Sequence, residues 1–145
     1  MVSHEEPLAR SAFVAWHRIG TRWADNDAYG HVNNTVYYEW FDTAVNGWLI
    51  ENGLLNVENG PVVGLVVATS CSYFAPLSFP DDVEVGLSLE RLGTSSVTYR
   101  LGVFGIGDAH ASAQGRFTHA YVDRDQRRPL PLSDGWRTSL AALKS

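Results

Sequence analysis

The stretch RWADNDAYGHVNNTVYYEWFD, residues 22–42, joins a polar loop to a strongly aromatic segment. From its last part onward, apolar residues fall in adjacent pairs every four positions. The pairs are Val36–Tyr37, Trp40–Phe41, Ala44–Val45 and Trp48–Leu49. At about 100° per residue, this stripe drifts by about 40° per repeat and winds around a helix. The spacing therefore predicts a long helix with a wide buried surface, which a sheet curled around it would bury well.

Both ends of this helix carry the expected signals. Asn33 or Asn34 would cap its start, because a short amide side chain accepts hydrogen bonds from the free N–H groups of the first turn. Gly53 can adopt the left-handed conformation that stops a helix. The predicted helix therefore occupies the region between these residues.

The rest of the chain is rich in strand-forming residues. Val83 to Leu89 and Val97 to Val103 alternate apolar and polar residues, which indicates strands with one solvated face. Short turns at Gly93-Thr94 and at residues 105–108 predict an antiparallel meander. The remaining expected elements are strands over 12–23, 61–73 and 109–122 and a short helix over 134–143 that Ser133 would cap. The fold class is therefore α+β, an antiparallel sheet with one central helix.

Composition indicates an ordinary soluble protein with a single domain over residues 1–145. Apolar residues make up 45% of the chain and charged residues 19%. A net charge of -5 argues against nucleic acid and anionic membranes as partners. The acidic segment MVSHEEPLAR, residues 1–10, does not resemble a signal peptide, and no apolar run is long enough to span a bilayer. We therefore expect a cytoplasmic location.

Cys71, the only cysteine, excludes an internal disulfide and a zinc site with several cysteines. It lies in an apolar run with no histidine near it in sequence, so we interpret it as a small strand residue. No metal site is expected.

The polar loop has a chemical and a purely local interpretation. Asp25 and Asp27 are two positions apart, so an extended backbone would point both carboxylates the same way. A carboxylate beside a helix start can attack or activate water while backbone N–H groups polarise a carbonyl. Alternatively, Asp and Asn occur in turns and caps for local reasons alone. The loop composition leaves both interpretations open.

The stretch resembles the hotdog-fold acyl-CoA thioesterases of the 4-hydroxybenzoyl-CoA thioesterase-like family. The shared pattern is R-x-x-D-x-D-x-x-G-H-V-N-N-x-x-Y, here Arg22, Asp25, Asp27, Gly30, His31, Val32, Asn33, Asn34 and Tyr37. Later segments such as YFAPLSFPDDVEV and ERLGTSSVTYRL are also similar, so the resemblance covers nearly the whole chain. It implies a hotdog fold, a curved antiparallel sheet wrapped around the long helix.

The resemblance also implies roles for single residues. Asp27 would be the nucleophile or general base, and the backbone N–H of Asn34 would polarise the thioester carbonyl. His31 and Asn33 would shape the site or position water, whereas Asp25 would hold the loop through Arg22. Expected substrate contacts, some with equally good structural explanations, are Gly30, Tyr37, Arg91, Ser95 and Ser96, with Arg127 or Arg128 as further candidates for the coenzyme A phosphates.

The implied reaction converts an acyl-CoA and water into a free acid and coenzyme A. No cofactor is expected, because coenzyme A is part of the substrate. The family assembles as homodimers or homotetramers with sites at the subunit interface. Two alternatives stay open: a thioesterase acting on acyl-carrier-protein thioesters, and a non-catalytic protein that binds acyl thioesters.

Overall fold

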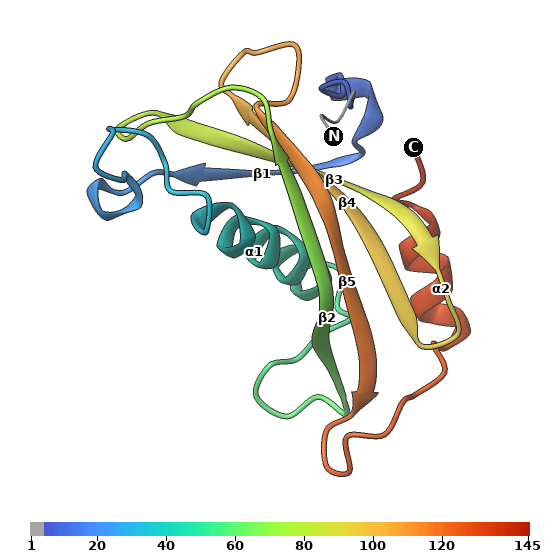
Figure 1. The fold of residues 1–145 in the computed structure, drawn as a ribbon. Coiled ribbons are helices and arrows are strands. Elements are labelled where there is room, and N and C mark those ends of the chain that lie inside the picture. Colours follow the sequence, from blue (N-terminus) through green and yellow to red (C-terminus); the bar gives the residue numbers. More distant parts are fainter. Residues whose placement is uncertain (1–4) are drawn as a thin grey trace.

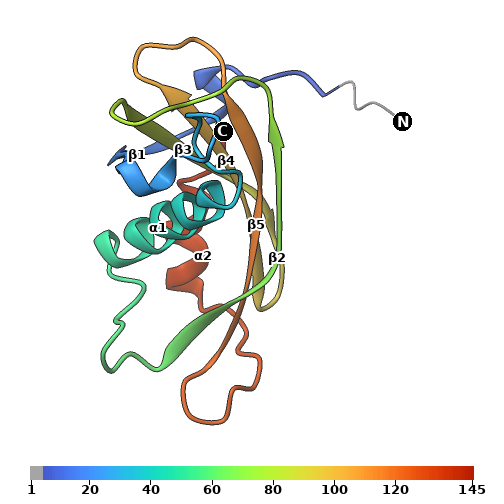
Figure 2. The same ribbon diagram turned by 60° about the vertical axis from the view of Figure 1, so that its left-hand side comes forward.

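The computed structural model describes residues 5–145, so the first four residues of the leading polar segment lie outside the described residues. One antiparallel five-stranded sheet, with strand order β1-β3-β4-β5-β2, curves around helix α1 (Figures 1 and 2). The strands are β1 (Ala15–Gly20), β2 (Val62–Tyr73), β3 (Asp82–Leu92), β4 (Ser96–Gly105) and β5 (Ala113–Asp123), and the helices are α1 (Val36–Glu51) and α2 (Asp134–Ala141). This is the hotdog fold, as the resemblance implies.

Helix α1 follows the predicted winding pattern. Its buried residues are Val36, Tyr37, Trp40, Phe41, Ala44, Val45 and Leu49. Gly53 ends the helix with a φ of 71°, as expected. The N–H of Gly53 donates to the carbonyl of Ile50 (3.1 Å), and the N–H of Leu54 donates to the carbonyl of Leu49 (2.9 Å). These bonds satisfy two of the last carbonyls of the helix. The central helix was therefore predictable from spacing alone.

The first strand is shorter than expected. It spans Ala15–Gly20, because Arg10–Ala12 and Trp23–Asp25 each form a turn of 3-10 helix. The last strand begins at Ala113, and the final helix ends at Ala141. The Ser133 side chain caps that helix by accepting from the N–H of Trp136, as predicted. The element order is correct throughout, and the differences are confined to element ends.

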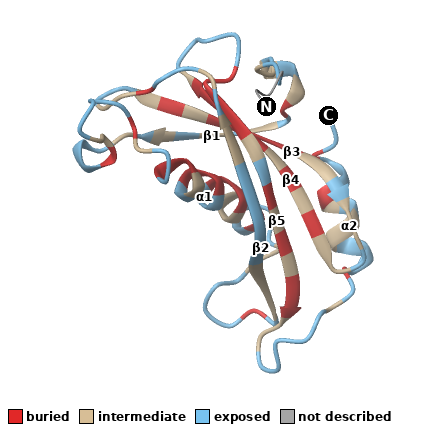
Figure 3. Ribbon diagram, in the orientation of Figure 1, coloured by how far each residue is buried: buried red, intermediate tan, exposed pale blue. Residues whose placement is uncertain are grey.

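The main core lies between the concave face of the sheet and α1. In β4, Val97, Tyr99, Leu101 and Val103 are completely buried on this face (Figure 3). The alternation read from the sequence therefore identified the buried face. The expected solvated face is only partly solvated, because the N-terminal segment covers one end of it.

That covering segment forms a second, smaller core on the convex face. Phe13 packs there against Phe104, with ring centroids 5.7 Å apart. Gly86 and Gly102 make room for it, since a Cβ at either position would lie within 2.7 Å of the Phe13 side chain. Arg10 stacks on the Phe104 ring (4.9 Å) and pairs with Glu84 (2.9 Å). Segment 5–13 thus belongs to the packed structure.

Strand β2 is one edge of the sheet, and its middle is solvent-exposed. Residues 66–70 are all exposed, including Val66 at 49% and Val67 at 60%. The pairing with β5 shifts register between Val66 and Ala68. An exposed apolar edge strand is a template for pairing with another chain. Of the helices within residues 5–145, none has the length and apolar character needed to cross a membrane.

Candidate functional site

The polar loop between β1 and α1 is fixed against the segment that follows β2. The N–H of Val32 donates to Leu77 (2.8 Å), and the Val32 side chain is buried, as the sequence suggested. The N–H of Phe79 donates to the Asn26 side chain (3.0 Å), and the Ser78 hydroxyl donates to the carbonyl of Gly30 (2.8 Å). These three bonds tie the loop to a single place in the fold.

The two loop aspartates lie in different environments. Asp25 is 1% exposed, and its carboxylate accepts three hydrogen bonds from Arg22, one from the backbone N–H and two from the guanidinium. The expectation that both carboxylates point the same way is wrong, because Trp23–Asp25 is a 3-10 turn and not extended chain. Asp25 therefore holds the loop, in agreement with the predicted pairing to Arg22.

Asp27 is half-buried and faces an open pocket. Its Oδ1 accepts from the backbone N–H of Tyr29 (2.8 Å) and, more weakly, from that of His31 (3.4 Å). Its Oδ2 accepts no hydrogen bond from any residue between 5 and 145. One oxygen thus fixes the carboxylate to its own turn, and the other is available to a ligand or to water.

At the start of α1, the backbone N–H of Asn34 has a different environment from its neighbours. The Asn33 side chain accepts from the N–H (3.0 Å) and the hydroxyl (2.9 Å) of Thr35, and the N–H of Val36 donates to the Asn33 carbonyl (3.0 Å). The N-cap of α1 is Thr35, which makes no side-chain capping bond, so neither Asn33 nor Asn34 is the N-cap as predicted. Asn33 instead fixes the turn that precedes the helix. The N–H of Asn34 has no acceptor within the described part of the chain. An unpaired N–H at a helix start can stabilise developing negative charge on an oxygen.

An open pocket of about 420 Å³ brings these groups together. Its wall is formed by Asp27, His31, Val32, Asn34, Tyr37, Tyr73, Phe74, Ala75 and Pro76. The rings of Tyr37 and Tyr73 meet edge to face at 5.0 Å. Burial raises the pKa of Tyr37 to about 12, and it also raises the pKa of Tyr73. Both phenols therefore stay protonated near neutral pH, and the pocket combines a carboxylate, a backbone donor and apolar walls.

The predicted site residues separate into two groups. Asp27, His31, Asn34 and Tyr37 line the pocket, while Asn33 and Gly30 shape its loop. Across the sheet, Ser96 of β4 lies opposite Ala120 of β5, and Ala120 lies opposite Leu65 of β2. Leu65 precedes the pocket residue Tyr73 by eight positions along β2. At about 3.3 Å per strand residue, Ser96 lies roughly 26 Å from the pocket level. The predicted substrate contacts at this end of β3 and β4 are Arg91, Ser95 and Ser96; within one chain they lie away from Asp27.

Sequence reasoning overlooked the segment from Tyr73 to Pro76. It supplies four lining residues, the last residue of β2 and the three that follow it. An aromatic pair followed by Ala-Pro after a long apolar run was a visible signal, since it marks the end of a strand. Which face of the fold it would reach could not be read from that signal.

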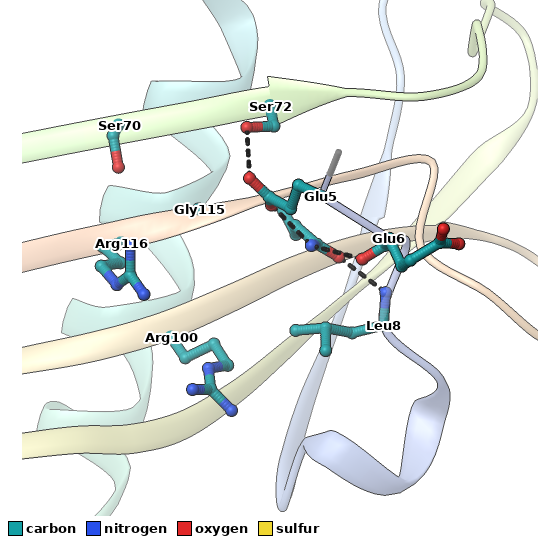
Figure 4. Close-up of a pocket in the computed structure, with 9 residues that line it drawn as sticks. Glu5, Glu6, Leu8, Ser70, Ser72, Arg100, Gly115 and Arg116 are labelled. Atoms are coloured by element: carbon teal, nitrogen blue, oxygen red, sulfur yellow. Dashed lines mark hydrogen bonds between the residues drawn. The ribbon is translucent and has the colours of Figure 1, made fainter. Parts of the chain in front are cut away.

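A second cavity, of about 300 Å³, lies on the convex face between the N-terminal segment and β4, β5 and β2 (Figure 4). Gln114 donates to the Glu5 carboxylate (2.6 Å) and accepts from the N–H of Leu8 (2.7 Å), and the Ser72 hydroxyl also donates to Glu5 (3.0 Å). Arg116 on the other side pairs with Glu90. Because its polar groups bind one another, we interpret this cavity as part of the attachment of the N-terminal segment.

Acidic, histidine and cysteine side chains do not gather in threes around a metal-sized space anywhere in residues 5–145.

Comparison with known proteins gives the family. Residues 21–140 match the thioesterase-like superfamily, a span that includes the loop, α1 and all strands after it. The chain belongs to the thioesterase-like superfamily. A search of curated proteins returned no match.

Solved structures agree with this assignment. The PA5185 protein of Pseudomonas aeruginosa is 50% identical, with a TM-score of 0.93 over 97% of this chain and 98% of that one. The PA2801 protein of the same organism, a candidate thioesterase, is 29% identical, with a TM-score of 0.80 over 88% and 98%. Slr0204 of Synechocystis, a 1,4-dihydroxy-2-naphthoyl-CoA thioesterase, is 21% identical, with a TM-score of 0.76 over 87% and 94%, and shows the shared fold alone.

Proposed function

We propose that this protein hydrolyses an acyl-CoA thioester to a free acid and coenzyme A, with Asp27 as the catalytic carboxylate. The observation that carries the proposal is that Oδ2 of Asp27 and the N–H of Asn34, both without a partner in residues 5–145, belong to residues that line one pocket. Thioester hydrolysis needs these two functions together, a base or nucleophile and a donor for the carbonyl oxygen.

The reaction follows from this arrangement. The N–H of Asn34 donates to the thioester carbonyl oxygen, where negative charge develops as the carbon becomes tetrahedral. Oδ2 of Asp27 either takes a proton from the attacking water or attacks the carbon itself, forming an anhydride that water then hydrolyses. In both cases the C–S bond breaks, the thiol of coenzyme A leaves, and the acid is released. His31, exposed at the pocket, helps to position water.

The preference for coenzyme A over other thioesters rests on the resemblance of residues 22–42 to the acyl-CoA thioesterases. Arg91, Ser95 and Ser96 lie too far along the sheet to reach the thioester bound in the same chain. We therefore propose that they contribute to coenzyme A binding across a subunit interface. Strand β2, with its exposed edge, is the surface at which two copies would form one continuous sheet.

The first prediction tests the catalytic carboxylate. Thiol release is measured from short, long and aromatic acyl-CoAs, and from an acyl-carrier-protein thioester, with wild type and Asp27→Asn. The substitution keeps the size and the hydrogen bond to Tyr29 but removes the charge, so kcat should fall by roughly 10²- to 10⁴-fold. Asp125→Asn, at an exposed turn, is the matched control and should keep wild-type activity.

Equal thiol release by wild type and Asp27→Asn would exclude Asp27 as the catalytic group. Hydrolysis of the carrier-protein thioester alone would assign a different substrate class. If wild type hydrolyses none of the thioesters but binds acyl-CoA in isothermal titration calorimetry, the protein is a binding module.

A further inference from the structure

Tyr73, at the end of β2, makes a contact that links the sheet to the start of α1. Its hydroxyl donates to the backbone carbonyl of Asn34 (2.9 Å). Tyr73 is itself firmly held. It pairs with Ala113 of β5, and the N–H of the next residue, Phe74, donates to Ser112 (2.8 Å). The phenol therefore reaches the helix start from a rigid support.

The hydrogen bonds around Asn34 fix both of its peptide groups. In the peptide group after it, the carbonyl accepts from Tyr73 and the N–H of Thr35 donates to the Asn33 side chain. In the peptide group before it, the Asn33 carbonyl accepts from the N–H of Val36. The N–H of Asn34 is the one group of these two peptides that has no partner within residues 5–145.

We infer that Tyr73 is a positioning residue, which orients the Asn34 N–H toward the carbonyl oxygen of the bound thioester. This inference rests on the proposed function. Without the Tyr73 hydroxyl, the peptide group between Asn34 and Thr35 keeps only the bond to Asn33 and can rotate. The direction of the neighbouring N–H then varies, and a donor that must be aimed before the reaction loses part of its effect.

The surroundings of Tyr73 suit this role. Burial raises the pKa of its phenol, so the donor proton is retained over the whole range in which enzymes are assayed. The ring also packs edge to face on Tyr37, which is 3% exposed on the first turn of α1. One face of the ring therefore forms the pocket wall while the hydroxyl orients the backbone.

The second prediction is tested with Tyr73→Phe, which keeps the ring and removes only the hydroxyl. We expect kcat for the preferred acyl-CoA to fall about tenfold, while KM stays within about twofold, because the affected bond matters most in the transition state. Thr138→Val is the control, since it removes an exposed hydroxyl of α2 away from the pocket, and it should leave both constants unchanged. An unchanged kcat in Tyr73→Phe, or a change in KM alone, would overturn the inference.

A second readout does not need activity. Amide hydrogen exchange, followed by NMR on ¹⁵N-labelled protein, should be at least severalfold faster at Thr35 in Tyr73→Phe than in wild type, with a shifted Asn34 amide resonance. Thr138→Val should leave both signals unchanged. If wild type hydrolyses no thioester, the proposed function fails, yet unchanged exchange at Thr35 would still refute the orienting role of Tyr73, and faster exchange would support it.

Discussion

At the scale of single residues, the two loop aspartates differ in what their carboxylates bind. Asp25 is buried and saturated by Arg22, whereas Asp27 keeps one carboxylate oxygen free at the pocket. Removing the charge of Asp25 should lower the free energy of unfolding. Removing the charge of Asp27 should lower the rate of the proposed reaction. Measuring both the free energy of unfolding and kcat for each variant can therefore separate the two roles.

The third prediction concerns Asp25→Asn. The amide cannot accept equally from the backbone and the guanidinium of Arg22, and one of its two ends becomes a donor. We expect the free energy of unfolding to fall by about 2 kcal/mol, since hydrogen bonds to a charged group are lost at a buried site. Urea denaturation measures this loss, and Asp27→Asn should change the unfolding free energy by less than about 0.5 kcal/mol. Equal losses in both variants would contradict the division of roles.

At the scale of elements, β4 and β5 share a buried polar group in the middle of an apolar core. The hydroxyls of Tyr99 and Tyr121 are 2.7 Å apart, and Nδ1 of His119 lies 3.0 Å from the Tyr121 hydroxyl. All three side chains are almost fully buried. Gly64 on β2 leaves the space that the imidazole fills, because a Cβ there would lie 2.9 Å from Nδ1. The network thus depends on three neighbouring strands.

The fourth prediction follows from the buried imidazole. Burial lowers the pKa of His119 to about 4 from an ordinary 6.5. Below pH 6.5 the unfolded chain therefore binds a proton that the folded protein does not, and stability decreases as the pH falls toward 4. Between pH 7.5 and 5 we expect a loss of about 2 kcal/mol in the free energy of unfolding.

Urea denaturation at the two pH values measures this loss, and His119→Gln should remove most of it. The matched control is His110→Gln at an exposed position, which should retain the wild-type dependence. A wild-type dependence that persists in His119→Gln would show that other groups cause it.

At the scale of the whole molecule, the exposed edge of β2 leaves the sheet incomplete. Its central residues are exposed, and two of them are valines. Two chains that pair along this edge would remove both exposed edges and could place Arg91, Ser95 and Ser96 of one chain near the pocket of the other. The proposed reaction would then depend on association.

The fifth prediction is that the 16.0 kDa chain forms a dimer or a larger even-numbered assembly in solution. Val67→Lys places a charge on the exposed edge and should shift the mass to that of one chain, as measured by sedimentation velocity. Thioester hydrolysis should fall with it. Val57→Lys, a change at an equally exposed valine in the loop before β2, should preserve both mass and activity. A monomeric wild type would contradict the interface.

The sequence by itself determined the central helix, the order of helices and strands along the chain, and the loop that carries Asp27. These depend on local patterns: a four-residue spacing, a two-residue alternation and a glycine at residue 53 that can end a helix. The same patterns could not place the ends of β1, because short 3-10 turns at Arg10–Ala12 and Trp23–Asp25 have no comparable periodicity. A helix or strand can be predicted from the sequence where its apolar pattern repeats over several turns or residue pairs.

Only the tertiary structure decided which polar groups remain free. Asp25 and Asp27 differ because the 3-10 turn at Trp23–Asp25 directs the first carboxylate to Arg22. Tyr73 contacts Asn34 because a strand end 39 residues away packs against the helix start. Such contacts depend on the curvature of the sheet and on the path of the loop. For this protein, the sequence located the reacting carboxylate that we propose, and the fold determined the backbone donor facing the same pocket.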